Sequence, residues 1–138
     1  MKRAVIFGTF DCLHKGHRYF LEFSRQHADH LTAVVAPDSV VTLRKGRPPV
    51  QPLVERMRVL KEVGSIDAVV AGDREEGEWS VFQNAVVDSC IVGYDQIALL
   101  EALKRHTTQQ GLAVEFITAD AFEPFRFASS LMRSPTYA

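Results

Sequence analysis

Apolar residues fall along the chain in short runs that alternate with longer stretches of mixed polarity. Runs rich in β-branched and aromatic residues predict strands at 4–7, 31–36, 68–71, 90–93 and 113–117, the first two of them buried. Between them, helices are predicted at 17–26, 52–63 and 97–106, with a further short helix from Ser129. The basic stretch 44–51 and the acidic stretch 73–78 are predicted to be loops, and 79–82 fits no element firmly.

Strands and helices that alternate at this spacing are typical of βαβ units. The chain is therefore predicted to be an α/β protein with a parallel sheet of about five strands and helices on both faces. Ligands of such sheets bind beyond the carboxyl ends of the strands. We expect the functional site in the segments that share this edge, namely 8–17, 38–47, 73–78, 94–96 and 119–133.

Composition narrows the possible classes of function. The chain has 138 residues, of which 46% are hydrophobic and 24% charged, so one globular domain over 1–138 is expected, either whole or a module of a larger enzyme. The net charge of −1 excludes a generally basic nucleic-acid binder but leaves room for a local anion site. Cys12 and Cys90 are too few for a disulfide scaffold and are interpreted as packing residues. Without an apolar run of the roughly 20 residues that span a bilayer, a cytoplasmic protein with no membrane partner is expected.

The segment after the first predicted strand, GTFDCLHKGH at 8–17, carries the strongest chemical signal. Gly8 stands at a strand end, where a ligand can approach the backbone closely. His14 and His17 stand at the start of a helix, whose free N–H groups favour anions. Two imidazoles three residues apart could both donate to phosphate oxygens as negative charge develops. A metal-binding pair is the alternative, but no second thiol stands near Cys12.

This segment resembles the HxGH signature of the cytidylyltransferase-like nucleotidyltransferases. It is most similar to the GTFDxLHxGH group, which contains glycerol-3-phosphate cytidylyltransferase and archaeal-type FAD synthase. Residues 44–47 and 52–56 resemble the lysine loop and the ER pair of the family, and VGYDQ at 92–96 is similar to archaeal FAD synthases. FASSLMR at 127–133 resembles the ISSTxIR signature, with Ala128 in place of the first serine.

The resemblance implies a Rossmann-like sheet and attack of a phosphate or phosphonate oxygen on the α-phosphorus of a nucleoside triphosphate, with release of pyrophosphate. An acceptor that is already ionised needs no general base, so catalysis reduces to alignment and stabilisation of charge. The implied catalytic residues are His14, His17, Lys45 and Arg133. The implied nucleotide contacts are Gly8, Thr9, Phe10, His14, Gly16, His17, Gly93, Asp95, Ser129, Ser130 and Arg133. The implied acceptor contacts are Asp11, Lys45 and Arg56.

Three of these residues have simpler interpretations, which stay open. Asp11 could be a turn or helix-cap aspartate, Arg56 a surface arginine, and Asp95 a cap. Mg²⁺ is expected to arrive with the triphosphate, because the sequence suggests no dedicated carboxylate cage. The resemblance also implies a homodimer.

The substrates follow less directly than the reaction. CTP with a small phosphorylated or phosphonate acceptor is the favoured pair, because the chain is compact. ATP with FMN is the alternative, because GYDQ at 93–96 resembles archaeal FAD synthases. This pair requires an apolar slot for the isoalloxazine ring of FMN. A regulatory module that binds a nucleotide without catalysis is a third hypothesis. The presence of His14, His17, Lys45 and Arg133 together argues against it.

Overall fold

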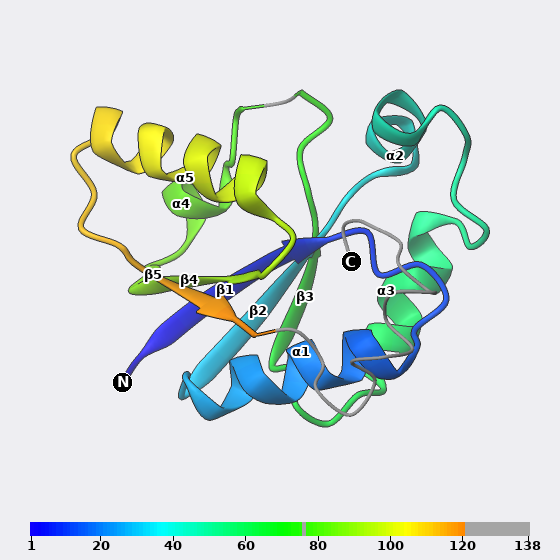
Figure 1. The fold of residues 1–138 in the computed structure, drawn as a ribbon, viewed down its shortest axis with the longest axis horizontal. Coiled ribbons are helices and arrows are strands. Elements are labelled where there is room, and N and C mark those ends of the chain that lie inside the picture. The colour runs from blue at the N-terminus through cyan, green and yellow to red at the C-terminus, as the bar shows by residue number, and fades with distance from the viewer. Residues whose placement is uncertain (76, 121–138) are drawn as a thin grey trace.

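The computed structural model describes residues 1–75 and 77–120. Its strands are β1 (Arg3–Gly8), β2 (His30–Val35), β3 (Ala68–Ala71), β4 (Ser89–Gly93) and β5 (Glu115–Ala119). Its helices are α1 (Lys15–Gln26), α2 (Asp38–Lys45), α3 (Leu53–Lys61), α4 (Val81–Asn84) and α5 (Ile97–Gln109). The strands pair in parallel in the order β3-β2-β1-β4-β5 (Figure 1). The predicted α/β class and Rossmann-like parallel sheet are confirmed.

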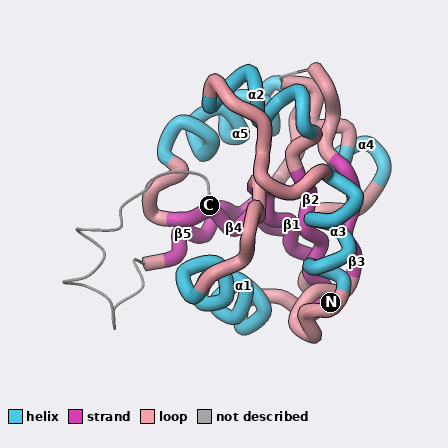
Figure 2. Tube along the Cα trace, turned by 90° about the vertical axis from the view of Figure 1, so that its right-hand side faces the viewer, coloured by secondary structure: helices cyan, strands magenta, loops and turns pink. Residues whose placement is uncertain are grey.

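Alternate residues of each strand face opposite layers of helices, as strand geometry requires. Ile6, Ala33 and Ile91 pack into a core with Leu21 of α1 and Leu60 of α3. The next residues along the strands face the other way. The second core contains Val5, Phe7, Val34, Cys90, Val92 and Phe82, together with Leu103 of α5. The sheet therefore lies between two helical layers, with α1 on one side and α5 on the other (Figure 2).

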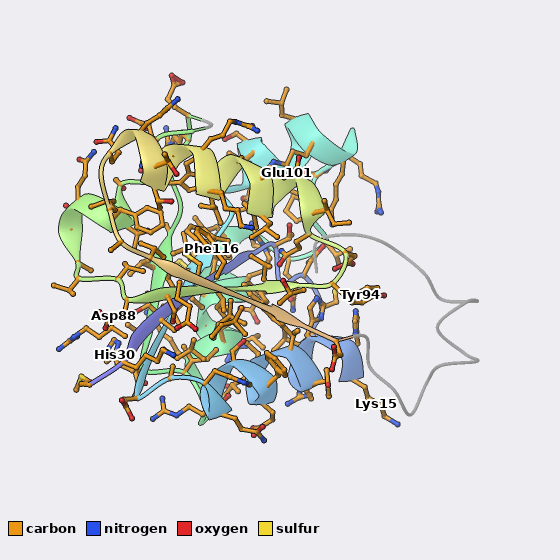
Figure 3. The ribbon with its side chains drawn as sticks, turned by 60° about the vertical axis from the view of Figure 1, so that its left-hand side comes forward. Lys15, His30, Asp88, Tyr94, Glu101 and Phe116 are labelled. Atoms are coloured by element: carbon orange, nitrogen blue, oxygen red, sulfur yellow. The ribbon has the colours of Figure 1, made fainter. Side chains whose placement is uncertain are left out.

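The carboxyl ends of the strands meet at one end of the molecule. Figure 3 shows Lys15 and Tyr94, which follow β1 and β4, at that end, and His30 and Asp88, at the beginnings of β2 and β4, at the opposite end. The chain leaves β1 toward β2 on one side, whereas β4 lies on the other side of β1. The loops after β1 and β4 therefore diverge at the point where open α/β sheets bind ligands.

Helix α2 is the main departure from the predicted elements, since its end was predicted to be loop. The β-branched Val40 and Val41 have low helix propensity, but both are buried, so packing outweighs propensity. The helix stops at Gly46, which takes the left-handed conformation at φ 77°. The unassigned stretch 79–82 contains the start of α4, and β5 begins later than predicted. The helix predicted from Ser129 lies outside the described residues.

The other helices follow the predicted positions closely. Pro52 stands directly before α3, and Ile97 begins α5, as the sequence indicates. Within the described ranges, every helix is too short or too polar to cross a membrane.

Candidate active site

The loop from Gly8 to His14 is held in a conformation that few residues adopt. Phe10 and Cys12 both have positive φ, at 53° and 54°, which costs roughly 1–3 kcal/mol for each non-glycine residue. The Phe10 ring folds back over Gly8 so closely that a Cβ there would lie 2.9 Å from its Cε2 and Cζ atoms. Because the Phe10 side chain is only 1% exposed, it supports the loop, and the predicted contact of Phe10 with the nucleotide stays a prediction. The interpretation of Cys12 as a packing residue is wrong, because Cys12 is exposed.

His14 and His17 cap helix α1 reciprocally. The backbone N–H of Gly16 donates to Nδ1 of His14 at 3.0 Å, and the backbone N–H of His14 donates to Nδ1 of His17 at 3.1 Å. The two rings lie with centroids 3.9 Å apart. This is a capping box in which imidazoles replace the usual hydroxyl and carboxylate. The spacing that suggested an anion site thus also fixes the start of the helix.

The capping box determines where the imidazole protons lie. A backbone N–H can only donate, so Nδ1 of each ring must carry a lone pair, and the neutral ring then bears its proton on Nε2. Burial, followed by the charges of His14 and Lys45, lowers the pKa of His17 to about 3. Partial burial also lowers the pKa of His14. Both rings are therefore neutral Nε2–H donors at physiological pH.

The pKa of His17 predicts how folding stability depends on pH. In the unfolded chain His17 has a pKa near 6.5, whereas in the folded protein it becomes protonated only near pH 3. The unfolded state therefore binds more protons between these two pH values, and the folding stability falls as the pH is lowered from 6.5 to 3. We expect the titration of His17 to lower the free energy of unfolding by about 2 kcal/mol when the pH is lowered from 7.5 to 5. Urea unfolding of wild type and His17→Asn at both pH values measures this, because asparagine keeps an acceptor near Nδ1 and does not titrate. Equal losses in the two proteins would contradict the prediction.

Asp11 ties the first loop to the basic segment 44–51. Its Oδ2 accepts the backbone N–H of Val50 at 2.8 Å, and its Oδ1 accepts that of Gln51 at 2.9 Å. In return, the backbone N–H of Cys12 donates to Oε1 of Gln51 at 3.1 Å. Asp11 therefore positions the basic segment beside the histidines, and its predicted contact with the acceptor stays a prediction.

Lys45, the last residue of α2, belongs electrostatically to the same site. Its charge contributes to the lowered pKa of His17. Desolvation, and then the charge of Arg47, lowers the pKa of Lys45 itself, while Asp11 acts in the opposite sense. The structure thus brings Lys45, Asp11 and the histidine pair into one neighbourhood.

Arg56 is buried, which corrects its interpretation as a surface arginine, while its predicted contact with the acceptor stays a prediction. Its side chain is 0% exposed. Its Nε donates to the carbonyl of Gln51 at 2.9 Å, and Nη1 donates to the carbonyls of Thr9 and Ala36, both at 2.8 Å. Its Nη2 pairs with Oδ1 of Asp38 at 2.7 Å. Four of the five guanidinium N–H groups are therefore occupied, and Arg56 joins the loops after β1 and β2 to the start of α3.

Gln96 is a functional-site residue that the sequence argument did not single out. Its Oε1 accepts the backbone N–H of Gly93 at 2.7 Å, and its Nε2 donates to the carbonyl of Phe7 at 3.1 Å. The side chain is buried and joins the ends of β4 and β1. A Cβ on Gly93 would lie 3.1 Å from Oδ1 of Asp95, which is exposed beside the strand end. The only sequence signal for Gln96 was its place as the last residue of the GYDQ segment.

A pocket of about 380 Å³ lies against β2 and β3, on the face that α4 and α5 share. Thr32, Val34 and Val70 line it from the sheet, and Trp79 lines it from the loop before α4. Gly8 and Thr9 also line it, and the loop that they begin leads to His14 at the start of α1 and, one turn into the helix, to His17. The pocket and the histidine pair therefore share the end of β1.

The remaining predicted contacts divide into two groups. Thr9 is buried, and its carbonyl accepts a hydrogen bond from Arg56. Gly16 lies in the first turn of α1 and donates its backbone N–H to Nδ1 of His14. Ser129, Ser130 and Arg133 lie outside the described residues, so their roles stay predictions. Over 1–75 and 77–120, the structure contains no group of three or more His, Cys, Asp or Glu residues that could hold a metal ion.

Comparison with known proteins identifies the family. A model of the family described as cytidylyltransferase-like matches residues 5–134. The chain is 39% identical over 115 residues to the FAD synthase of Pyrococcus horikoshii, an alignment that covers 83% of this chain and 78% of that protein. It is 33% identical over 131 residues to the FAD synthase of Ferroglobus placidus, covering 94% and 84% of the two chains.

Solved structures share the fold of this chain. The lipopolysaccharide core biosynthesis protein from Thermoplasma volcanium superposes with a TM-score of 0.80 at 27% identity, over 89% of this chain and 99% of that one. Pantothenate synthetase from Thermus thermophilus has a TM-score of 0.57 at 17% identity, over 87% of this chain and 56% of its own length, which is a likeness of fold alone. With the neutral histidine pair at the start of α1, these findings establish that the chain belongs to the cytidylyltransferase-like family and is a nucleotidyltransferase.

Proposed function

We propose that the chain is an FMN adenylyltransferase, which makes FAD and pyrophosphate from ATP and FMN. The observation that carries the proposal is its similarity to archaeal FAD synthases, at 39% and 33% identity over 83% and 94% of this chain. The GYDQ segment at 93–96 agrees with this similarity, because its sequence resembles the corresponding segment of archaeal FAD synthases. These observations favour ATP and FMN over CTP with a small acceptor.

The site residues suit this reaction. A phosphate oxygen of FMN attacks the α-phosphorus of ATP, a new P–O bond forms, and the bond from the α-phosphorus to the bridging oxygen breaks as pyrophosphate leaves. Because the FMN phosphate is ionised at neutral pH, no proton has to be removed from it. His14 and His17 supply Nε2–H donors for the charge on the α-phosphate of the transferred adenylyl group, and Lys45 adds a positive charge beside them.

The histidines suit this role because they are neutral. A neutral donor stabilises developing charge without holding the product as strongly as an imidazolium would. Their positions are set by backbone bonds that exist before any ligand arrives, so no reorganisation is needed during the reaction.

Mg²⁺ is proposed to enter with ATP. Its oxygen ligands would come from the triphosphate, since the described carboxylates form no group that could cage an ion. When bound, it would neutralise charge on the phosphates and on the leaving pyrophosphate. The homodimer and the cytoplasmic location stay predictions.

The experiment is a two-by-two assay of product formation. The protein is incubated with Mg²⁺ and either ATP or CTP, each with FMN or glycerol 3-phosphate, and FAD and pyrophosphate are measured. We expect FAD only from ATP with FMN. Turnover of CTP with glycerol 3-phosphate in its place would overturn the proposal in favour of a cytidylyltransferase. Turnover in no combination would favour the non-catalytic nucleotide-binding module.

A further inference from the structure

We propose that Trp79 forms a wall of the binding site for the flat ring of the acceptor, in the pocket on β2 and β3, and that it confers the preference for an aromatic acceptor. This inference rests on the proposed function and adds the place and the residue that recognise the flavin. It supplies the apolar slot that the sequence alone did not locate.

The pocket has the size and lining that a flat aromatic ring needs. Its volume of about 380 Å³ falls within the usual range of small-molecule sites, roughly 300–1,000 Å³. Val34 and Val70 offer aliphatic surface from neighbouring parallel strands, where they are paired in register. Val70 is 37% exposed although it lies on a sheet face, so apolar surface is available there to a ligand. A ring lying on this surface would bury it.

Trp79 adopts an energetically costly backbone conformation at the pocket. Its φ of 38° lies in the left-handed region, which bulky residues rarely adopt and which costs roughly 1–3 kcal/mol. The Asp73 carboxylate maintains the turn by accepting the backbone N–H of Ser80 at 2.8 Å and its hydroxyl at 2.6 Å. A strained aromatic residue fixed at a pocket is an observation that points toward ligand binding.

The indole ring packs against neighbouring side chains but is incompletely covered. Its centroid lies 5.2 Å from that of the His106 ring in an edge-on arrangement, and it packs against the core around Phe82. The residue nevertheless stays half-exposed and lines the pocket. An indole supported on one side and open on another is suited to stack against a flat ring.

The pocket and the histidine pair meet at the end of β1. Gly8 and Thr9 line the pocket, and the loop that they begin leads to His14 and to the first turn of α1, which carries His17. A ring bound beside Trp79 would therefore have its phosphate chain leading along the end of β1 toward the histidines. Arg44 of α2 also lines the pocket and places a positive charge along this route.

The test exploits the fact that the chain contains one tryptophan. FMN without ATP should quench the tryptophan fluorescence of the wild type, and its own fluorescence should be quenched in return. Trp79→Ala should raise the Kd and the KM for FMN by roughly ten- to a hundredfold, the range of aromatic stacking, and leave the KM for ATP unchanged. Trp79→Phe should keep most of the affinity. Val86→Ala is the matched control, because Val86 follows α4, is 70% exposed and does not line the pocket.

A second variant keeps the test decisive if Trp79→Ala fails to fold. Val70→Lys places a charge on the exposed apolar surface of β3 and should raise the KM for FMN without changing that for ATP. If the wild type makes FAD but neither variant alters the KM for FMN, the inference is wrong and the proposed function stands. If the wild type makes no FAD, both are overturned.

Discussion

Replacing His14 by asparagine should lower kcat by roughly 10²- to 10³-fold while leaving the protein almost as stable as the wild type. Asparagine is a good N-cap residue, so its side-chain oxygen can accept the Gly16 N–H that now bonds to Nδ1 of His14. What the variant loses is the Nε2–H donor. An interaction made with the developing charge of the transition state is expected to change kcat more than KM.

His14→Ala provides the comparison that separates capping from catalysis. Alanine removes both the cap and the donor, so it should lose activity to the same extent and also about 1 kcal/mol of stability. Single-turnover rates and urea unfolding of the two variants measure these quantities. A His14→Asn protein that retains a third or more of wild-type kcat would show that the Nε2–H group does not act on the transition state.

The fold was predictable because its signals are local. Strands such as 90–93 are short apolar runs that end at glycine, and the burial of both sheet faces at β4 requires no more than this pattern. The histidine pair was predictable because helix-start chemistry depends on residues within one turn. Helix α2 was missed because its stability comes from burial of Val40 and Val41, which is a tertiary effect.

The supporting residues of the site could not be predicted because their partners are distant in sequence. Asp11 bonds to backbone groups 39 and 40 residues away, and Arg56 to a carbonyl 47 residues away. The same is true of Gln96, whose partner Phe7 lies 89 residues earlier. A motif identifies residue types, but only the fold decides whether a charged side chain faces a ligand or the backbone of another loop.

Replacing Arg56 by methionine should destabilise the protein by about 3–5 kcal/mol, because the change removes a buried guanidinium that donates to three backbone carbonyls. The carbonyls of Thr9, Ala36 and Gln51 would lose their donor. Each buried acceptor left without a partner costs about 1–3 kcal/mol, although relaxation and water recover part of the sum. Arg56→Lys keeps the charge but cannot reproduce the planar fork, so it should also be clearly destabilised. Urea unfolding at pH 7 measures both variants.

Arg58→Met is the control, because Arg58 stands two residues after Arg56 on α3 and pairs with Glu55 and Glu62 in solvent. Exposed ion pairs contribute little, so the unfolding midpoint of this variant should stay close to that of the wild type. The comparison also distinguishes a scaffold from an acceptor-binding arginine. If Arg56→Lys were as stable as the wild type and only the KM of the acceptor rose, Arg56 would have to reach the acceptor, contrary to its burial. Loss of stability would instead show that the guanidinium holds together the three loops that position the histidines.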